Sequence, residues 1–269
     1  MVPVNFFVVG NKRSGTSLLA RLLNLHPEIY CTHESDLAWL IHQAQQRNES
    51  PWKATEGGWE YSLDDPVGLR HTVRTLGKKF WQQADYSNPK EVFDKGTSLL
   101  MSLGDKVDAV KAKPEQVRFL GDKKPVQYAD PVVRTWLDDE FEPLYLHSVR
   151  HPRNCISSMR ETALIPWWND DLREVTDQWA RHEQWALSIP EENRFTYRYE
   201  DLVANPVGVM RALYARLGAS QPSAMVRKKI RNSVLPQDNR TLVDIPYTKR
   251  AKEVMEIHGY GPKNVKERP

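Results

Sequence analysis

The chain has 269 residues, of which 40% are hydrophobic and 27% are charged, and its formal net charge is +3. This balance is ordinary for a globular protein and excludes a wholly disordered, collagen-like or coiled-coil chain. The positive charges form no dense stripe of the kind that nucleic-acid binding needs, so we expect a small polyanionic ligand and no nucleic-acid partner.

The apolar stretches are much shorter than a membrane span, and the first predicted strand begins too close to Met1 to leave room for a signal peptide. We therefore expect no membrane segment and a cytoplasmic location. Cys31 and Cys155 lie in no CxxC or Cys/His spacing, which predicts neither a disulfide framework nor a metal site. At this length we expect a single domain over residues 1–269.

Short apolar runs alternate with helical patterns along the chain. Strands are predicted at Asn5–Val9, Val117–Leu120, Leu144–Val149 and Phe195–Tyr199, with one more short strand after the first helix. Helices are predicted over Leu18–Leu25, Leu37–Arg47, Val67–Gln83, Val92–Val110, Pro131–Asp139, Arg153–Thr162, Leu172–Ile189 and Val207–Leu217. The alternation predicts an α/β fold of P-loop type: three layers, α/β/α, around a mainly parallel sheet that binds ligands at the carboxyl ends of its strands.

Two Trp-bearing stretches, residues 49–63 and 164–171, interrupt this alternation. They are predicted to be surface loops anchored by Trp side chains in the core, or alternatively walls of a substrate site. The segment 221–269 carries no pattern that predicts a function.

The turn after the first strand has the glycine spacing of a nucleotide P-loop. Residues 10–17 read GNKRSGTS, between a predicted strand and a predicted helix. Backbone N–H groups in such a loop converge on a phosphate at the positive end of the helix. However, Thr16 stands where a nucleoside-triphosphate loop carries lysine, and the basic residue Arg13 lies inside the loop. The predicted phosphate-binding residues here are Lys12, Arg13, Ser14, Gly15, Thr16 and Ser17.

These residues also resemble a known family. RSGTS at 13–17, followed by LLxxLL at 18–23 and His-Pro at 26–27, is similar to the 5'-phosphosulfate-binding segment of the sulfotransferases that use 3'-phosphoadenosine-5'-phosphosulfate (PAPS). Arg150 at a strand end, with Ser158 eight residues later, resembles the family's 3'-phosphate-binding segment. The YEDL run beginning at Tyr199 resembles a third segment, in which the tyrosine approaches the nucleotide and the acidic pair caps the following helix.

The resemblance implies transfer of a sulfuryl group from PAPS to a hydroxyl or amine, with release of 3'-phosphoadenosine-5'-phosphate (PAP) and without a metal. Glu34 lies eight residues after the His of the His-Pro pair, the place of the general base in tyrosylprotein-type and several carbohydrate-type members. Lys123 matches the lysine that stabilises or protonates the leaving phosphate, and Arg13 is assigned to the catalytic group with them.

The chain departs from the small-molecule cytosolic members, because it lacks their KTHLP-like His and their GxxGxxK loop. This difference disfavours phenol and steroid acceptors. The acceptor is expected to be a small molecule, a glycan or a peptide, and neither its identity nor the oligomeric state follows from the sequence.

Two other functions remain open on the residues alone. The first is a P-loop small-molecule kinase that uses ATP, which Thr16 in place of lysine disfavours. The second is a non-catalytic module that binds PAP or PAPS, which only a turnover assay would separate from an enzyme.

Overall fold

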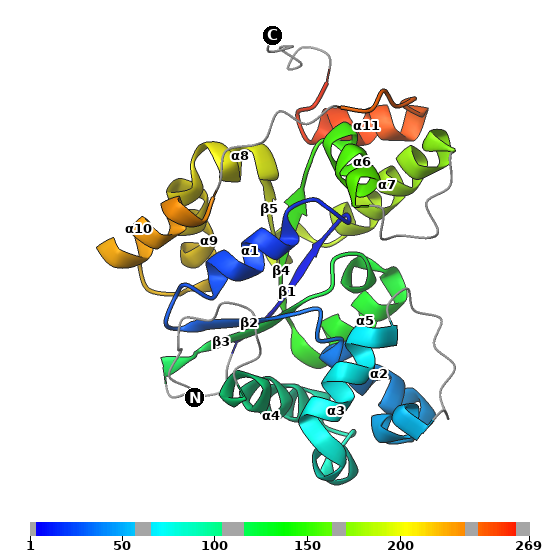
Figure 1. The fold of residues 1–269 in the computed structure, drawn as a ribbon, viewed down its shortest axis with the longest axis vertical. Coiled ribbons are helices and arrows are strands. Elements are labelled where there is room, and N and C mark those ends of the chain that lie inside the picture. The colour runs from blue at the N-terminus through cyan, green and yellow to red at the C-terminus, as the bar shows by residue number, and fades with distance from the viewer. Residues whose placement is uncertain (1–3, 57–65, 104–115, 163–170, 235–241, 262–269) are drawn as a thin grey trace.

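A computed structural model describes residues 4–56, 66–103, 116–162, 171–234 and 242–261 (Figure 1). Its strands are β1 (Val4–Gly10), β2 (Ile29–His33), β3 (Phe119–Lys123), β4 (Leu144–Val149) and β5 (Arg194–Arg198). Its helices are α1 (Thr16–Leu23), α2 (Leu37–Arg47), α3 (Pro66–Gln83), α4 (Pro89–Ser102), α5 (Pro131–Phe141), α6 (Pro152–Glu161), α7 (Leu172–Leu187), α8 (Tyr199–Ala204), α9 (Pro206–Leu217), α10 (Ala224–Ser233) and α11 (Lys249–Ile257).

The five strands form one sheet in the order β2-β3-β1-β4-β5, and all four neighbouring pairs are parallel. The register pairs His33 with Lys123, Gly10 with Ser148, and Val149 with Arg198. The segments that leave the carboxyl ends of β1 to β5 therefore start at one edge of the sheet, where a parallel α/β fold places its ligand site. The predicted α/β fold with a parallel sheet is confirmed.

Alternation along β1 divides the core into two layers. Phe6 and Val8 pack under α1, α8, α9 and α10, whereas Phe7 and Val9 face α2, α3, α4 and α5 on the other side of the sheet (Figure 1). A smaller core joins Val149 and α6 to α7 and α11 beyond the carboxyl end of β4.

Several element boundaries differ from the predicted ones. β3 extends through Gly121 to Lys123, because its polar end is buried against β2 rather than exposed. Helix α4 starts earlier than predicted, at Pro89 with Asn88 as its cap, and ends at Ser102; the remainder of the predicted helix falls in 104–115, outside the described residues. Gly77, with a φ of 80°, interrupts α3.

The Trp-bearing stretch 164–171 falls outside the described residues except for Asp171, and of the stretch 49–63 the structure describes residues 49–56. Within the part of 49–63 that the structure describes, Trp52 packs against the core cluster that contains Phe7. None of the helices in the described part of the chain is long and apolar enough to cross a membrane.

We predict that Gly121→Ala destabilises the protein by about 1–3 kcal/mol, the usual cost of overpacking a filled core. A Cβ at this position would lie 2.3 Å from the Phe6 ring, which is itself completely buried. Denaturant unfolding measures the difference, and Val132→Ala, at a side chain that is 72% exposed, is the control with little expected effect. Equal stability of both variants would contradict the tight packing of β3 on β1.

Candidate active site

The loop between β1 and α1 leaves the first turn of α1 without a side-chain cap. Gly15, the residue before the helix, has a φ of 96° and no side chain to offer, and the first turn contains no acidic residue. Uncapped N–H groups at a helix start attract an anion. Ser14 stiffens the loop from within, because its hydroxyl donates to Asn11 O at 2.7 Å and its own carbonyl accepts from Ser148 Oγ at 2.8 Å.

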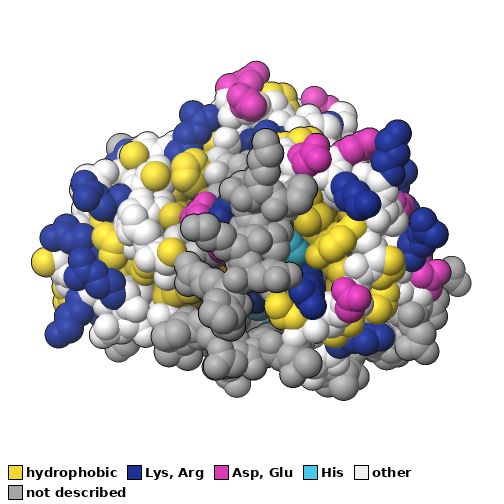
Figure 2. All heavy atoms as spheres, turned by 90° about the horizontal axis from the view of Figure 1, so that it is seen from above, with side chains coloured by type: hydrophobic (Ala, Val, Ile, Leu, Met, Phe, Trp, Pro, Cys, Tyr) yellow, Lys and Arg dark blue, Asp and Glu magenta, His cyan; other side chains and the backbone are white. Residues whose placement is uncertain are grey.

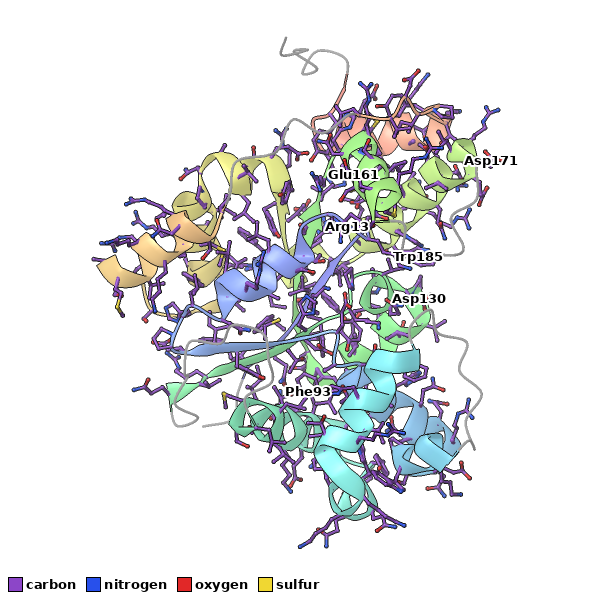
Figure 3. The ribbon with its side chains drawn as sticks, in the orientation of Figure 1. Arg13, Phe93, Asp130, Glu161, Asp171 and Trp185 are labelled. Carbon is purple, nitrogen blue, oxygen red and sulfur yellow. The ribbon has the colours of Figure 1, made fainter. Side chains whose placement is uncertain are left out.

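Arg13 joins this loop to the second predicted anion-binding segment. Its Nε donates to Ser158 Oγ at 3.1 Å, and its carbonyl accepts from Arg150 Nη1 at 3.0 Å. Figure 3 labels Arg13 near the middle of the molecule, where the loop meets α6 and α7. Arg150 and Ser158, which are eight positions apart in the sequence, therefore both contact Arg13.

Tyr199, the first residue of α8, completes this side of the site. The guanidinium of Arg150 lies over its ring, 4.3 Å from the ring centre. The ring also fills the space beside Gly15, where a Cβ would approach it to 2.2 Å. Arg13, Gly15, Arg150, Ser158 and Tyr199, all predicted as nucleotide-binding residues, thus form one continuous group.

Lys123 and Glu34 form an ion pair at the ends of β3 and β2. Lys123 is only 1% exposed, so it is no solvated surface lysine, and its Nζ also donates to Ser17 Oγ at 3.1 Å. Burial alone would raise the pKa of Glu34, but the charge of Lys123 and its hydrogen bond outweigh that effect and hold the pKa below its ordinary value. Burial lowers the pKa of Lys123, against the opposing effect of Glu34.

The buried carboxylate of Asp122 holds the ends of β2 and β3 together. Its Oδ1 accepts from Thr32 Oγ1 at 2.6 Å and from Lys123 N at 2.8 Å, and its Oδ2 accepts from Tyr128 OH at 2.5 Å. Glu34, the residue after β2, has a φ of 56°, and its N–H donates to Lys123 O at 3.0 Å. This left-handed residue turns the chain as β2 ends and brings the Glu34 side chain to Lys123.

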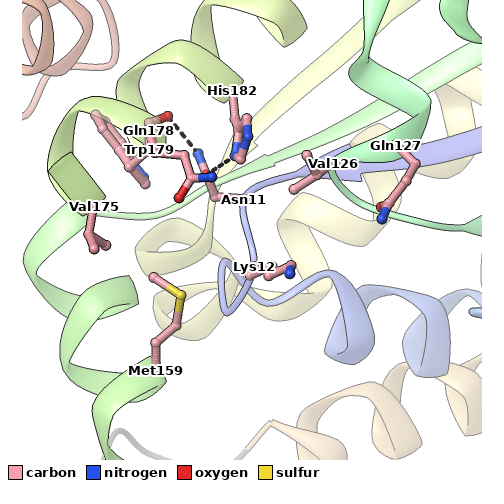
Figure 4. Close-up of a pocket in the computed structure, with 9 residues that line it drawn as sticks. All are labelled: Asn11, Lys12, Val126, Gln127, Met159, Val175, Gln178, Trp179 and His182. Atoms are coloured by element: carbon pink, nitrogen blue, oxygen red, sulfur yellow. Dashed lines mark hydrogen bonds between the residues drawn. The ribbon is translucent and has the colours of Figure 1, made fainter. Parts of the chain in front are cut away.

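The loop of residues 10–17 is called the phosphate loop from here on. A cavity of about 310 Å³ lies beside it (Figure 4). Its apolar lining consists of Val126, Met159, Val175 and Trp179, and its polar lining consists of Asn11, Lys12, Gln127, Gln178 and His182. Lys12 thus lines this cavity as well as belonging to the loop. The cavity wall includes Lys12, which precedes Arg13, and Val126, which follows Lys123 by three residues, so it shares two segments with the predicted reaction site.

A buried polar network supports the loop from the side of α7. Glu183 is completely buried and accepts from Asn11 Nδ2 at 2.6 Å, and its other oxygen lies 3.0 Å from His147 Nε2 and 3.2 Å from His258 Nε2. Burial alone would raise the pKa of Glu183, but the two histidines lower it to about 2. The carboxylate is therefore ionised and hydrogen-bonded, the form in which a buried charge is tolerated.

The segment after α10 also reaches the site. Tyr260 donates its hydroxyl to Glu200 Oε2 at 2.6 Å, and Glu200 Oε1 accepts from His151 N at 3.2 Å. Glu200 and Asp201 lie in the first turn of α8, but no side chain caps this helix by a hydrogen bond, and Glu200 instead connects α8 to the start of α6. His151 caps α6 through Arg153 N, so the first turn of α6 is less free for an anion than predicted.

Sequence reasoning missed Asn11, His147, His182 and Glu183. The only signal for His147 is a polar residue inside an apolar strand, and the signal for the last two is the polar pair within the WARHEQW run of α7. Neither pattern identifies its partners, because these lie 36 to 172 positions away in the chain.

A group of basic side chains lies away from the candidate site. Seen from above, Lys and Arg side chains gather at the left end of the molecule, where α10 with its exposed Lys228, Lys229 and Arg231 lies (Figure 2). This basic group is remote from the phosphate loop in Figure 1.

Within the described ranges, no group of three or more His, Cys, Asp or Glu side chains is arranged to hold a metal ion; a metal-free reaction stays a prediction.

Comparison with known proteins identifies the family. The model of the sulfotransferase family matches residues 3–223, so the chain belongs to the sulfotransferase family and is a transferase. No curated protein sequence matches significantly.

Solved structures with the same fold include sulfotransferase domains of biosynthetic enzymes. The domain from the curacin biosynthetic pathway has a TM-score of 0.59 and 18% identity over 97% of this chain and 98% of its own. The domain from the olefin synthase of Synechococcus PCC 7002 has a TM-score of 0.58 and 17% identity over 96% and 94%. The sulfotransferase STF9 from Mycobacterium avium has a TM-score of 0.55 and 16% identity over 96% and 76%. At these identities the likeness shows the shared fold.

We predict that the free energy of unfolding falls as the pH is lowered from 7 to 5. Burial lowers the pKa of His147, which is completely buried, so below pH about 6.5 the unfolded chain binds a proton that the folded chain excludes. The loss is at most about 1.4 kcal/mol per pH unit for each such histidine. Denaturant unfolding at several pH values measures it, and His147→Gln should give a shallower dependence; an identical slope would contradict a neutral buried His147.

Proposed function

We propose that the chain transfers a sulfuryl group from PAPS to a hydroxyl or amine acceptor and releases PAP. In this proposal Lys12 to Ser17 hold the 5'-phosphosulfate, Arg150, Ser158 and Arg13 hold the 3'-phosphate, and Tyr199 borders the nucleotide. The observation that carries the proposal is the position of Lys123, whose ammonium contacts both Glu34 and Ser17 of the phosphate loop. One cation thus connects the predicted base with the predicted leaving-group site.

The residues present fit a nucleotide that carries one anionic group at its 5' position and another at its 3' position. The start of α1 has no side-chain cap, and Arg150 Nε is buried with no hydrogen-bond partner in the described part of the chain. Both features leave hydrogen-bond donors without a side-chain partner, and an arginine fork with a serine hydroxyl suits a phosphate. Thr16 in place of the P-loop lysine favours a ligand without a γ-phosphate.

The chemistry of each side chain follows from its surroundings. PAPS, when bound, supplies a sulfuryl group on a phosphate that can leave. Glu34, whose pKa is lowered, is ionised at neutral pH and can take the proton of the acceptor as its oxygen or nitrogen bonds to sulfur. Lys123, whose pKa is lowered by burial, can stabilise or protonate the phosphate oxygen as the old S–O bond breaks. Arg13 adds a second cation beside the same loop.

We predict that Glu34→Gln lowers turnover by about 100-fold or more, the usual contribution of a general base. Binding of PAP should persist, because the phosphate contacts are on other residues. PAP release from PAPS in the presence of a mixed hydroxyl and amine acceptor library measures turnover, and calorimetry measures PAP binding.

The control is Glu256→Gln, at an exposed site on α11. Near-normal turnover of Glu34→Gln would remove Glu34 from the base role. If the wild-type protein binds PAP and turns over no acceptor, the non-catalytic binding module is the better description.

We predict that Arg150→Ala weakens binding of PAP by roughly 10- to 150-fold, the range for charge-assisted hydrogen bonds, and weakens AMP binding much less. PAP and AMP differ by the 3'-phosphate, so the ratio of their dissociation constants isolates that group. Arg231→Ala, on the exposed face of α10, is the matched control. Equal losses for PAP and AMP would contradict the assignment of Arg150 to the 3'-phosphate.

A further inference from the structure

The hydrogen bonds around Asn11 determine the protonation pattern of a cavity-lining histidine. Asn11 Nδ2 lies 2.6 Å from Glu183 Oε1 and 3.1 Å from Trp179 O, and both partners can only accept. The amide is therefore oriented with its nitrogen toward Glu183 and its oxygen toward His182. Asn11 Oδ1 lies 3.2 Å from His182 Nδ1 (Figure 4).

Because Asn11 Oδ1 can only accept, His182 Nδ1 must carry the hydrogen. In a neutral imidazole the other nitrogen, Nε2, then has a free lone pair and can only accept. Burial lowers the pKa of His182 to about 4 against the opposing charge of Glu183, and the nearby cation of Lys12 lowers it further, so the ring stays neutral at physiological pH. Nδ1 makes the only hydrogen bond that the described residues give this half-buried ring.

The lining of the cavity gives the rest of the recognition surface. Trp179 and Val175 lie on the same helix as His182, and Met159 and Val126 add apolar surface from α6 and from the segment after Lys123. A volume of about 310 Å³ is at the lower end of the range for ligand pockets, so the fitting molecule is small. A polar hydrogen of that molecule would find its partner at His182 Nε2.

We propose that this cavity takes the body of the acceptor, and that His182 Nε2 is a specificity-determining group that accepts a hydrogen bond from a second hydroxyl of that acceptor. This inference rests on the proposed function, since the cavity borders the segments of Arg13 and Lys123. The acceptor class is then a small molecule with a compact apolar body and at least two hydroxyl groups, one reacting at Glu34 and one bound at His182.

The test uses the full chain saturated with PAP and two probes that differ in one hydrogen-bond donor. The probes are 1,4-benzenedimethanol and its monomethyl ether, 4-(methoxymethyl)benzyl alcohol. We expect the diol to bind about five- to tenfold more tightly than the ether, as for one net hydrogen bond, and the difference to vanish in His182→Leu. His182→Gln, which keeps an acceptor atom, should retain part of it, and the exposed His71→Leu should retain all of it.

Histidine-ring ¹⁵N spectra provide a readout that a merely structural role would not change. His182 should show a protonated Nδ1 and a bare Nε2, and the diol should shift the Nε2 resonance more than the ether does. The proposal is overturned by a protonated Nε2, by equal affinities for the two probes in the wild type, by no binding of either probe, or by an unchanged preference in His182→Leu. Loss of turnover in both His182 variants with unchanged probe binding would make His182 a base instead, which also overturns it. Failure of the protein to bind PAP at all would instead count against the proposed function.

Discussion

The site depends on one buried negative charge. Glu183 lies where α7 faces the loop after β1, and it interacts with Asn11, with His147 of β4 and with His258 after α11. An ionised carboxylate in this position would be very unfavourable without those partners, so the three segments are held to it by the cost of leaving the charge unpaired. The phosphate loop is consequently attached both to α7, through Asn11 and Glu183, and to the segment after β3, where Gly10 N bonds to Pro125 O.

A second set of charged side chains, the ion pair of Lys123 and Glu34, contacts the phosphate loop through Ser17. Lys123 and Glu34 are adjacent because β2 and β3 are parallel neighbours whose ends Asp122 ties together. In this arrangement the lysine neutralises the carboxylate, and a phosphate near Ser17 would compete with Glu34 for the same ammonium. Under the proposed function, this competition would free the carboxylate to act as the base when the nucleotide is bound.

Local patterns in the sequence predict the fold and those residues of the candidate site that lie in short motifs. The strand, loop and helix at the start, the arginine at the end of β4 and the tyrosine at the start of α8 each leave a signal within a few residues, and parallel topology brings their ends together. The place of Lys123 in the site is harder to predict, because lysine is usually exposed and here it is buried at the end of a strand. The Asn11 and Glu183 contacts could not be predicted, since each partner is an ordinary polar residue and only packing of α7 against the loop makes them neighbours.

The contacts of α11 bear on where the functional unit ends. The family match stops at residue 223, yet His258 Nε2 lies 3.2 Å from Glu183 and Tyr260 donates a hydrogen bond to Glu200, and both carboxylates lie inside the matched range. A protein shortened to that range would keep every residue of the sulfotransferase motifs but would remove the hydrogen-bond donor of Glu200 and the His258 imidazole beside Glu183. The contacts that support the candidate site therefore extend beyond the segment by which the family is recognised.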